Sequence, residues 1–596
     1  MKRFFIIPLL MLGVHYFANA QNGKFPTWFE KSGGKETPRY DQTVEYCKIL
    51  DKASPLLTFT TFGKSPQGRD LPLLIADRNG LTDPAAIRKT GRVIILVEAC
   101  IHAGEPDGKD AGLMLLRDIA FNGKESLLDK VSILFIPIFN VDGHERFGPY
   151  NRINQNGPKE MGWRVTAQNL NLNRDFMKAD TPEMQAWLKL FNTWLPEFFV
   201  DCHVTDGADY QYKITYGLEI YGNMEKGLTD WTRDVFESQI SKQMLAIGYP
   251  MLPYVEFRNW HDPRSGLVTG VAPPMLSQGY TALQNRPGLL IETHMLKPYK
   301  VRVRATYEML RLTIELLNKE GHSLQEIEHK TDIYTASPEF RKPEMPLRFT
   351  DSQTDSTIVD FLGYEYTMEK SELTGGEWFK YDTTRPAVLK APFFNIPKVT
   401  VSCRLPEAYM IPPEWSALTA IMILHGIQVK YLALPATCTV QSYKFSNTKW
   451  QQRSYEGRHG VTFDCTPVTE TRLYPTGSAV IDMNQRTARV IAHFLEPEAS
   501  DSFIGWGFMD AIFEQKEYSE SYVMEGEARK LIAGNPALTD EFEKKKIAEP
   551  AFAADPDAIL NWFYSKTPYW DQHVNLYPIG RLMDPEILRS FSFLAK

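Results

Sequence analysis

The sequence has few cysteines for its length, and they form no metal or redox motif. Six cysteines occur in 596 residues, and no two of them make a CxxC pair. This pattern excludes a disulfide framework, a thiolate zinc site and a thioredoxin-like centre. Cys100 and Cys202 each lie within two residues of a candidate metal ligand described below, and we expect two small buried thiols there rather than a disulfide.

The chain also lacks positive charge and long apolar runs. Its formal net charge is −7, whereas nucleic-acid binding needs a basic face, so we expect no nucleic-acid partner. Beyond the N-terminus, no uncharged apolar stretch reaches the roughly 20 residues of a spanning helix, and we expect no stable membrane span. With 43% apolar and 12% aromatic residues, the composition is typical of a globular enzyme or binding protein.

The N-terminus is typical of a cleaved secretory signal. It begins MKRFFIIPLLMLGVHYFANAQ, with a basic start, a short apolar run and the triplet Ala18, Asn19, Ala20. The apolar run is too short for a membrane anchor, and no cysteine follows the triplet as in a bacterial lipoprotein. We therefore predict cleavage near Ala20 and a periplasmic or secreted protein, which is long enough for two or three domains.

Buried strands alternate with amphipathic helices in the first half of the chain. Apolar runs typical of strands occupy residues 92–99, 131–139, 196–203 and 287–295. Helical periodicity occupies residues 109–120, 184–195 and 304–321, the last ending near Gly321. This alternation predicts an α/β fold with a mixed, largely parallel sheet flanked by helices.

Beyond residue 330 the sequence pattern changes to short extended segments, prolines and turn residues, and this pattern favours a mixed α+β region. We predict a signal peptide over 1–20, a catalytic domain over 21–325 and one or more accessory domains of uncertain fold over 326–596. Glycan binding, capping of a cleft and dimerisation all remain open as roles for the last of these.

Several polar residues lie at the carboxyl ends of the predicted strands, where α/β sheets carry their binding and catalytic residues. These are His102, Asn140, His203 and Glu292. His102 and Glu105 stand three apart in EACIHAGEPDG, so one turn can present an imidazole and a carboxylate to one ion, and His203 can add a third ligand from another strand end. Hydrolytic zinc needs about three such ligands and one position for water, although an HxxE alone is a weak signal.

The ordered series around this motif is more specific. GKSPQGRDL, HAGE, IPIFNVDG, Trp163-Arg164, NLNRDF, DCHVTD and LLIETH occur in this order between residues 40 and 320. Together they resemble the carboxypeptidase A-like zinc metallocarboxypeptidase family. The resemblance implies one zinc ion per chain, bound by His102, Glu105 and His203, and a peptide substrate.

The same resemblance implies roles for further residues. Glu292 matches the general base, which takes a proton from water and gives it to the leaving amine. Arg164 matches the arginine that stabilises the oxyanion. Asn173 and Arg174 match the pair that binds a terminal carboxylate, which predicts an exopeptidase. Tyr280 is the nearest candidate for the family's mobile, substrate-contacting tyrosine, although an aromatic packing role competes with it.

Some positions depart from the family pattern. Asn171 stands where an aspartate usually supports a zinc-bound imidazole, and its amide oxygen can accept the same hydrogen bond with less charge. Ala103 and Gly104 replace side chains that contact substrate in digestive members, one of them an arginine, so the cleft should differ. His294 is expected to be packed or to support the site, and His425 to be structural.

Three functions remain open at this point. The first is an exported zinc carboxypeptidase acting on peptides. The second is an N-acyl amino acid deacylase or a cell-wall peptide amidase on the same scaffold, because deacylases share the HxxE and the asparagine-arginine pair. The third is an inactive peptide-binding protein. The sequence predicts neither the oligomeric state nor the preferred terminal residue.

Overall fold

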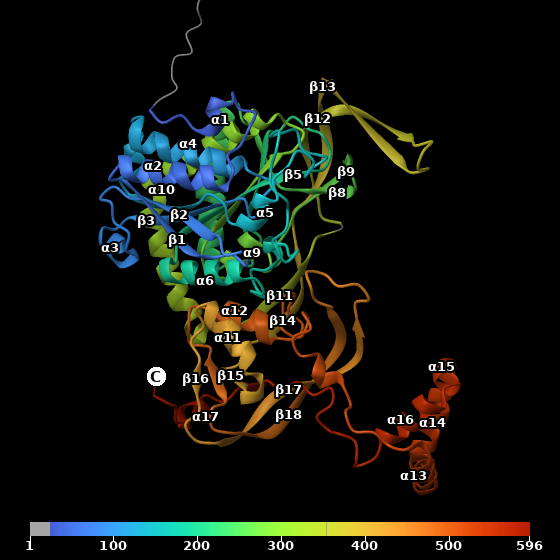
Figure 1. Ribbon diagram of the computed structural model, residues 1–596. Helices are drawn as coiled ribbons and strands as arrows, with labels where there is room; N and C mark the ends of the chain where they lie inside the picture. The colour runs from blue at the N-terminus through green and yellow to red at the C-terminus, as the bar shows by residue number, and fades with distance from the viewer. Residues whose placement is uncertain (1–23, 353, 596) are drawn as a thin grey trace, which may run out of the picture.

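The computed structural model describes residues 24–352 and 354–595, so the predicted signal over 1–20 lies outside the described residues. Figure 1 shows an α/β body from the first half of the chain, a second body formed by later strands, and a group of C-terminal helices beside it. Within the described ranges, no helix is long and apolar enough to cross a membrane.

An eight-stranded mixed sheet forms the centre of the first body. Its order is β1-β2-β4-β3-β5-β10-β6-β7. The bounds are β1 Leu57–Lys64, β2 Asp70–Ala76, β3 Val93–Ala99, β4 Val131–Ile136, β5 Phe198–Thr205, β6 Ile214–Leu218, β7 Met251–Pro253 and β10 Gly288–His294. The central pairs β4-β3, β3-β5 and β5-β10 are parallel, which confirms the predicted α/β class.

Helices cover both faces of this sheet, which explains why strand β3 is buried at every position. Their bounds are α1 Trp28–Lys31, α2 Tyr40–Ala53, α3 Pro84–Lys89, α4 Asp107–Phe121, α5 Val141–Glu145, α6 Pro182–Trp194, α7 Lys226–Asp230, α8 Ser238–Ala246, α9 Ser277–Leu283 and α10 Tyr299–Thr335. Side chains of α2, α4, α8 and α10 form one hydrophobic core. Those of α6 and α9 form another, which continues into the second body.

Helix α10 is longer than the sequence predicted. It was expected to end near Gly321 but continues to Thr335. A Cβ on Gly321 would lie 2.4 Å from Val93 Cγ2, so this glycine allows α10 to pack closely on β3 and does not end the helix. The predicted boundary after residue 325 falls inside α10, and the division into 21–325 and 326–596 stays a prediction.

The second half of the chain is rich in sheet. A six-stranded sheet has the order β16-β19-β15-β20-β17-β18, and the long hairpin β12-β13 joins β9 and β8 of the first half. The strand bounds are β8 Glu256–Asn259, β9 Asp262–Val268, β11 Glu344–Thr350, β12 Thr357–Lys370, β13 Glu377–Phe394, β14 Lys398–Arg404, β15 Ala408–Ile411, β16 Lys430–Tyr431, β17 Ala436–Trp450, β18 Val461–Tyr474, β19 Ala479–Asp482 and β20 Gly580–Leu582. The helices are α11 Ser416–Leu424, α12 Ala488–Leu495, α13 Ser521–Gly534, α14 Pro536–Ala548, α15 Pro550–Ala553, α16 Pro556–Tyr564 and α17 Pro585–Ser590.

The cysteines are unpaired thiols. All six lie in the described ranges, and each is free. Cys100 and Cys202 are buried near the strand ends that carry the candidate ligands, as expected of small apolar side chains.

Candidate metal centre and substrate cleft

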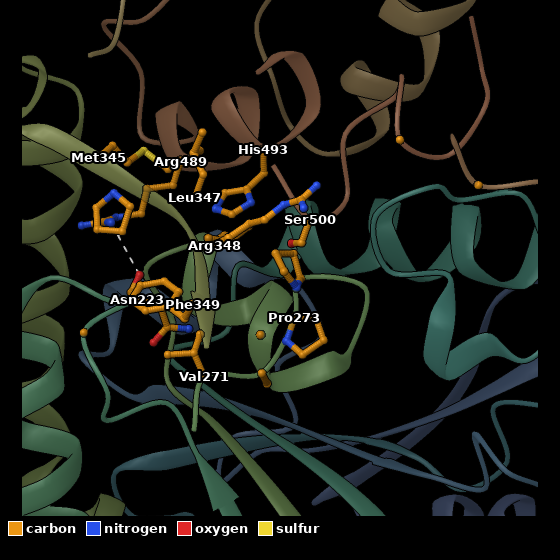
Figure 2. Close-up of a pocket in the computed structure, with 18 of the residues that line it drawn as sticks. Asn223, Val271, Pro273, Met345, Leu347, Arg348, Phe349, Arg489, His493 and Ser500 are labelled. Atoms are coloured by element: carbon orange, nitrogen blue, oxygen red, sulfur yellow. Dashed lines mark hydrogen bonds between the residues drawn. The ribbon is translucent and has the colours of Figure 1, made fainter. Parts of the chain in front are cut away.

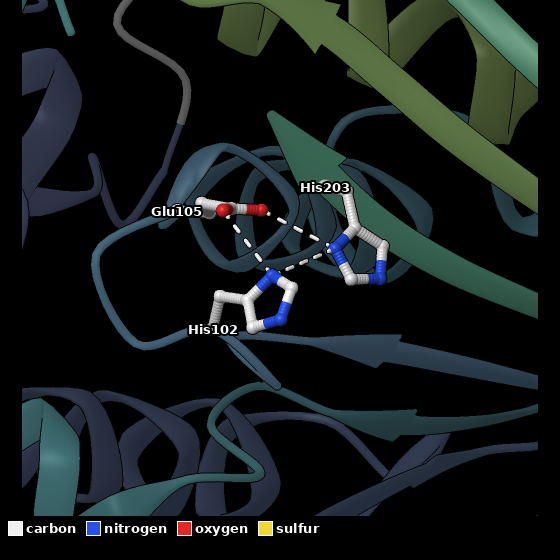
Figure 3. Close-up of side chains that lie close together, drawn as sticks. All are labelled: His102, Glu105 and His203. Carbon is white, nitrogen blue, oxygen red and sulfur yellow. Dashed lines mark hydrogen bonds and ion pairs between the residues drawn. The ribbon is translucent and has the colours of Figure 1, made fainter. Parts of the chain in front are cut away.

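Three predicted ligands converge at the carboxyl ends of β3 and β5. His102 and Glu105 lie in the turn between β3 and α4, and His203 lies in β5 (Figure 3). His203 Nδ1 is 3.1 Å from His102 Nδ1 and 3.2 Å from Glu105 Oε2, and His102 Nδ1 is 3.2 Å from Glu105 Oε1. One ligand atom from each residue lies within 4.8 Å of the others, and all three side chains are buried. This donor set fits a single divalent ion such as zinc.

The outer nitrogens of both imidazoles are engaged. His102 Nε2 lies 3.1 Å from Asn171 Oδ1, and His203 Nε2 lies 2.7 Å from Asp201 Oδ2. Because carboxylate and amide oxygens only accept hydrogen bonds, these contacts place a proton on each Nε2. Each Nδ1 can then direct a lone pair into the centre, the arrangement in which imidazole binds metals.

The electrostatics of the three groups also favour a cation. Burial lowers the pKa of His102 to about 4. Burial alone would raise the pKa of Glu105, but Arg152 and His102 hold it well below its usual range. Burial opposes the charging of His203, yet Asp201 and Glu105 hold its pKa well above the usual value, so the centre attracts positive charge.

Glu292 lies beside this centre on β10. It is the register partner of His203 on the neighbouring parallel strand, so both side chains point to the same face. Burial raises the pKa of Glu292 to about 8. Among the described residues, Glu292 Oε2 has no hydrogen-bond partner, which leaves this oxygen available to a water or a substrate group.

Two arginines reach the same carboxylate. Arg164 Nη1 lies 3.4 Å from Glu105 Oε1, and its side chain is 43% exposed, so it borders the open side of the centre. Arg152 Nη1 lies 2.7 Å from the same oxygen. Sequence reasoning missed Arg152, which lies in a loop outside every quoted motif.

The small residue at 104 explains where Arg152 lies. A Cβ on Gly104 would be 2.7 Å from Arg152 Cδ and 2.9 Å from Gly162 O. The Arg152 side chain therefore occupies the space that a side chain at 104 would fill. An arginine is absent from HAGE itself, but the fold brings one to the same turn from residue 152.

Arg174 of the predicted carboxylate-binding pair, and the nearby Asn171, contact the second half of the chain. Arg174 Nη1 donates to Asn173 O at 2.6 Å, and Arg174 Nε donates to Tyr455 Oη at 2.9 Å. Asn171 N donates to Glu456 Oε2 at 2.8 Å. Tyr455 and Glu456 belong to the 451–460 loop between β17 and β18, so this loop forms part of the wall beside the metal centre.

The structure corrects the role predicted for Tyr280. This residue is fully buried in α9, within the core that includes Phe176 and Trp187, and does not line the cleft. Its hydroxyl lies 2.9 Å from His425 Nδ1 and accepts from Gln284 Nε2 at 2.7 Å. Packing of the apolar ring against α6 decided its position, and His425 is structural as expected.

His294 is also structural. It is buried, its Nε2 lies 2.9 Å from Ala208 O, and its ring contacts Tyr210 at 4.3 Å between centroids. Its two nitrogens are engaged by backbone groups, because Leu296 N also donates to Nδ1 at 3.3 Å. Of the two roles considered for His294, the packed one fits the structure.

Comparison with known families agrees with this geometry. Residues 43–216 match the family model described as zinc carboxypeptidase, a range that includes His102, Glu105 and His203. This part of the chain is therefore similar to zinc carboxypeptidase domains. The match supports a metallocarboxypeptidase-type hydrolase, and the zinc in that family's description fits the donor set of this centre.

Curated relatives of this chain include fungal proteins. Carboxypeptidase 2 of Trichophyton rubrum is 24% identical over 502 residues, which cover 80% of this chain and 85% of the relative. Carboxypeptidase 2 of Trichophyton equinum is 24% identical over 506 residues, covering 81% and 86%. These alignments are longer than the motif-bearing residues 40–320, so the similarity extends into the second half of the chain.

Solved structures with partial similarity include two carboxypeptidases. Carboxypeptidase A from Helicoverpa armigera gives a TM-score of 0.37 at 14% identity, covering 48% of this chain and 74% of that one. A metallo-carboxypeptidase from Burkholderia cenocepacia gives a TM-score of 0.35 at 15% identity, covering 47% and 69%.

Proposed function

We propose that this protein is an exported, zinc-dependent carboxypeptidase that hydrolyses the C-terminal peptide bond of peptides. The observation that supports the proposal best is the convergence of His102, Glu105 and His203 beside Glu292, which lies opposite His203 on the next strand. Export is proposed from the N-terminal signal pattern, with catalysis assigned to 21–325.

A zinc ion bound by these residues would acidify water and polarise the scissile carbonyl. Glu292 takes the proton from the attacking water at its unpartnered Oε2 and delivers it to the leaving amine. Arg164 borders the open side of the centre and places its positive charge where the carbonyl oxygen gains negative charge.

Exopeptidase action is proposed from Asn173 and Arg174. Bonds to Tyr455 and to Asn173 O fix the plane of the Arg174 guanidinium, and a fixed guanidinium suits recognition of a terminal carboxylate. The 451–460 loop bounds the cleft on this side. We infer from these contacts that the accessory region 326–596 limits which peptide ends can enter.

The test combines metal analysis with a substrate panel. Protein lacking residues 1–20 should contain one zinc ion per chain. It should remove single residues from the C-terminus of peptides whose N-terminus is blocked. Activity confined to N-acyl amino acids would favour the deacylase instead. Metal-replete protein that binds peptide ends without turnover would favour the inactive binding protein.

A further inference from the structure

We propose that a cavity between the two halves of the chain binds a small organic anion, with one acidic group and an apolar body. The cavity measures about 470 Å³, a size that suits a small molecule. Residues 271–274 and Asn223 line it from the first half, and β11, β18 and α12 line it from the second (Figure 2). His102, Glu105, His203 and Glu292 are not among its lining residues, so this site is separate from the metal centre.

An arginine and a histidine enter the cavity from one face of α12. Arg489 and His493 are four residues apart, which places them on the same side of the helix. Arg489 is 8% exposed and His493 is 5% exposed. A buried arginine normally has an anionic partner, because removing a charge from water is costly.

The structure gives Arg489 no carboxylate partner. Its Nη1 lies 3.5 Å from Asn223 O, and its guanidinium lies 4.9 Å from the centre of the Phe340 ring. Within the part of the chain that the structure describes, Arg489 Nε and His493 Nδ1 have no hydrogen-bond partner. Buried polar atoms without a partner require an explanation, and two of them that line one cavity point to a ligand.

Acidic side chains near the cavity are engaged elsewhere. None of the described residues that line it is an aspartate or a glutamate. Glu219 accepts from Asn223 Nδ2 at 2.7 Å, and Asp501 accepts from Trp506 Nε1 at 3.1 Å. Glu225, whose charge favours the charged form of Arg489, accepts from Gly227 N at the start of α7. The lining of the cavity therefore carries positive charge only.

The remaining walls define the rest of the ligand. They are mostly apolar, with hydroxyl and amide groups at intervals, and include Val271, Leu283, Met345, Leu347 and Phe349. Arg348 is exposed and lies at the side of Ser500, where it adds a second cation (Figure 2). A ligand with a carboxylate at Arg489 and an apolar body against Val271 and Leu347 would fit both the charged and the apolar walls of the cavity. An inorganic anion would fit only the charged wall.

The test uses benzoate as the probe and benzyl alcohol as its uncharged counterpart. The full chain should carry Arg174→Met, so that the candidate carboxylate site in the catalytic cleft does not contribute. Calorimetry should show benzoate binding that is weakened roughly tenfold to hundredfold by Arg489→Met, the loss expected for a charge-assisted hydrogen bond. Benzyl alcohol should not bind detectably at the same concentrations.

Arg486→Gln is the matched control. Arg486 is a partly buried arginine just before α12, but it donates to Gln284 and does not line the cavity. Benzoate should bind this variant as tightly as it binds the parent. Equal affinity for the parent and for Arg489→Met, or no binding to the parent, would overturn the proposal.

A second measurement does not depend on whether the variants fold. Crystals of the unsubstituted protein soaked with 4-bromobenzoate should show bromine anomalous density between Val271 and Leu347, with the carboxylate at Arg489. Bromine density confined to the metal centre and Arg174 would contradict the proposal.

Discussion

Asp201→Asn should weaken zinc binding about 100-fold while the fold survives. Asp201 Oδ2 lies 2.7 Å from His203 Nε2, and the two side chains are 1% and 2% exposed, so water screens their interaction little. Residues that support a ligand imidazole in this way typically contribute 10- to 100-fold to metal affinity. The near-complete burial indicates the upper end, about 2.8 kcal/mol.

The metal-free protein should lose some stability but keep its fold. Asp201 favours the charged form of the buried His203, and this interaction is weakened when Asp201 becomes an amide. The loss of repulsion with Glu98, its register partner, offsets little of this, because burial and the charge of Asp201 already hold the pKa of Glu98 well above its usual value and keep it neutral. The metal-free variant should therefore melt below the parent in one cooperative transition, and zinc affinity measured well below that temperature separates loss of metal from loss of fold.

Asn171→Asp provides the opposite perturbation at the other histidine. Its Oδ1 lies 3.1 Å from His102 Nε2 and already accepts the proton, so a carboxylate there adds negative charge without a new contact. Zinc affinity should rise about tenfold. Competition with a chromophoric chelator at fixed pH would measure both variants. An affinity of Asp201→Asn within about twofold of the parent would refute the reasoning, because His203 would then not depend on its buried partner.

Four further predictions follow from the contacts of single residues. Glu292→Gln should lower kcat/KM for a blocked peptide about 10²- to 10⁴-fold at unchanged zinc content, whereas loss of zinc would make Glu292 a ligand. Tyr455→Phe should raise KM roughly three- to tenfold at constant kcat, because the Nε of Arg174 loses a partner, and an unchanged KM would separate the loop from substrate binding. Gly321→Val should destabilise the protein by about 1–3 kcal/mol in chemical denaturation, because α10 packs directly on β3, and full stability would contradict that contact. Burial raises the pKa of Asp110 to about 6, so the stability that Asp110 contributes is complete below about pH 4 and is lost as pH rises through 6. The melting temperature of the parent should therefore fall between pH 4 and 7, and Asp110→Asn should make this fall smaller. Equal falls in the parent and the variant would show that Asp110 does not cause the pH dependence.

Local sequence predicted the elements whose burial is uniform. The run RVIILVEA is apolar at nearly every position, and β3 is buried on both faces, so the sequence pattern and the environment agree. The sequence pattern was misleading at Gly321. A glycine within a helical pattern can mark the end of the helix or a close contact with another element, and only the position of β3 distinguishes the two. Tyr280 shows the same limit, since an aromatic side chain suits both a cleft and a core.

The sequence by itself predicted the candidate ligand chemistry: His102 and Glu105 share one turn, and His203 lies near the end of a buried strand, two residues after Asp201. These relations are local, and the spacing of a strand or turn fixes them. Only the tertiary structure brought Arg152 over Gly104 and the 451–460 loop against Arg174. Such contacts join segments whose separation along the chain carries no periodic signal, and they depend on how the two halves pack.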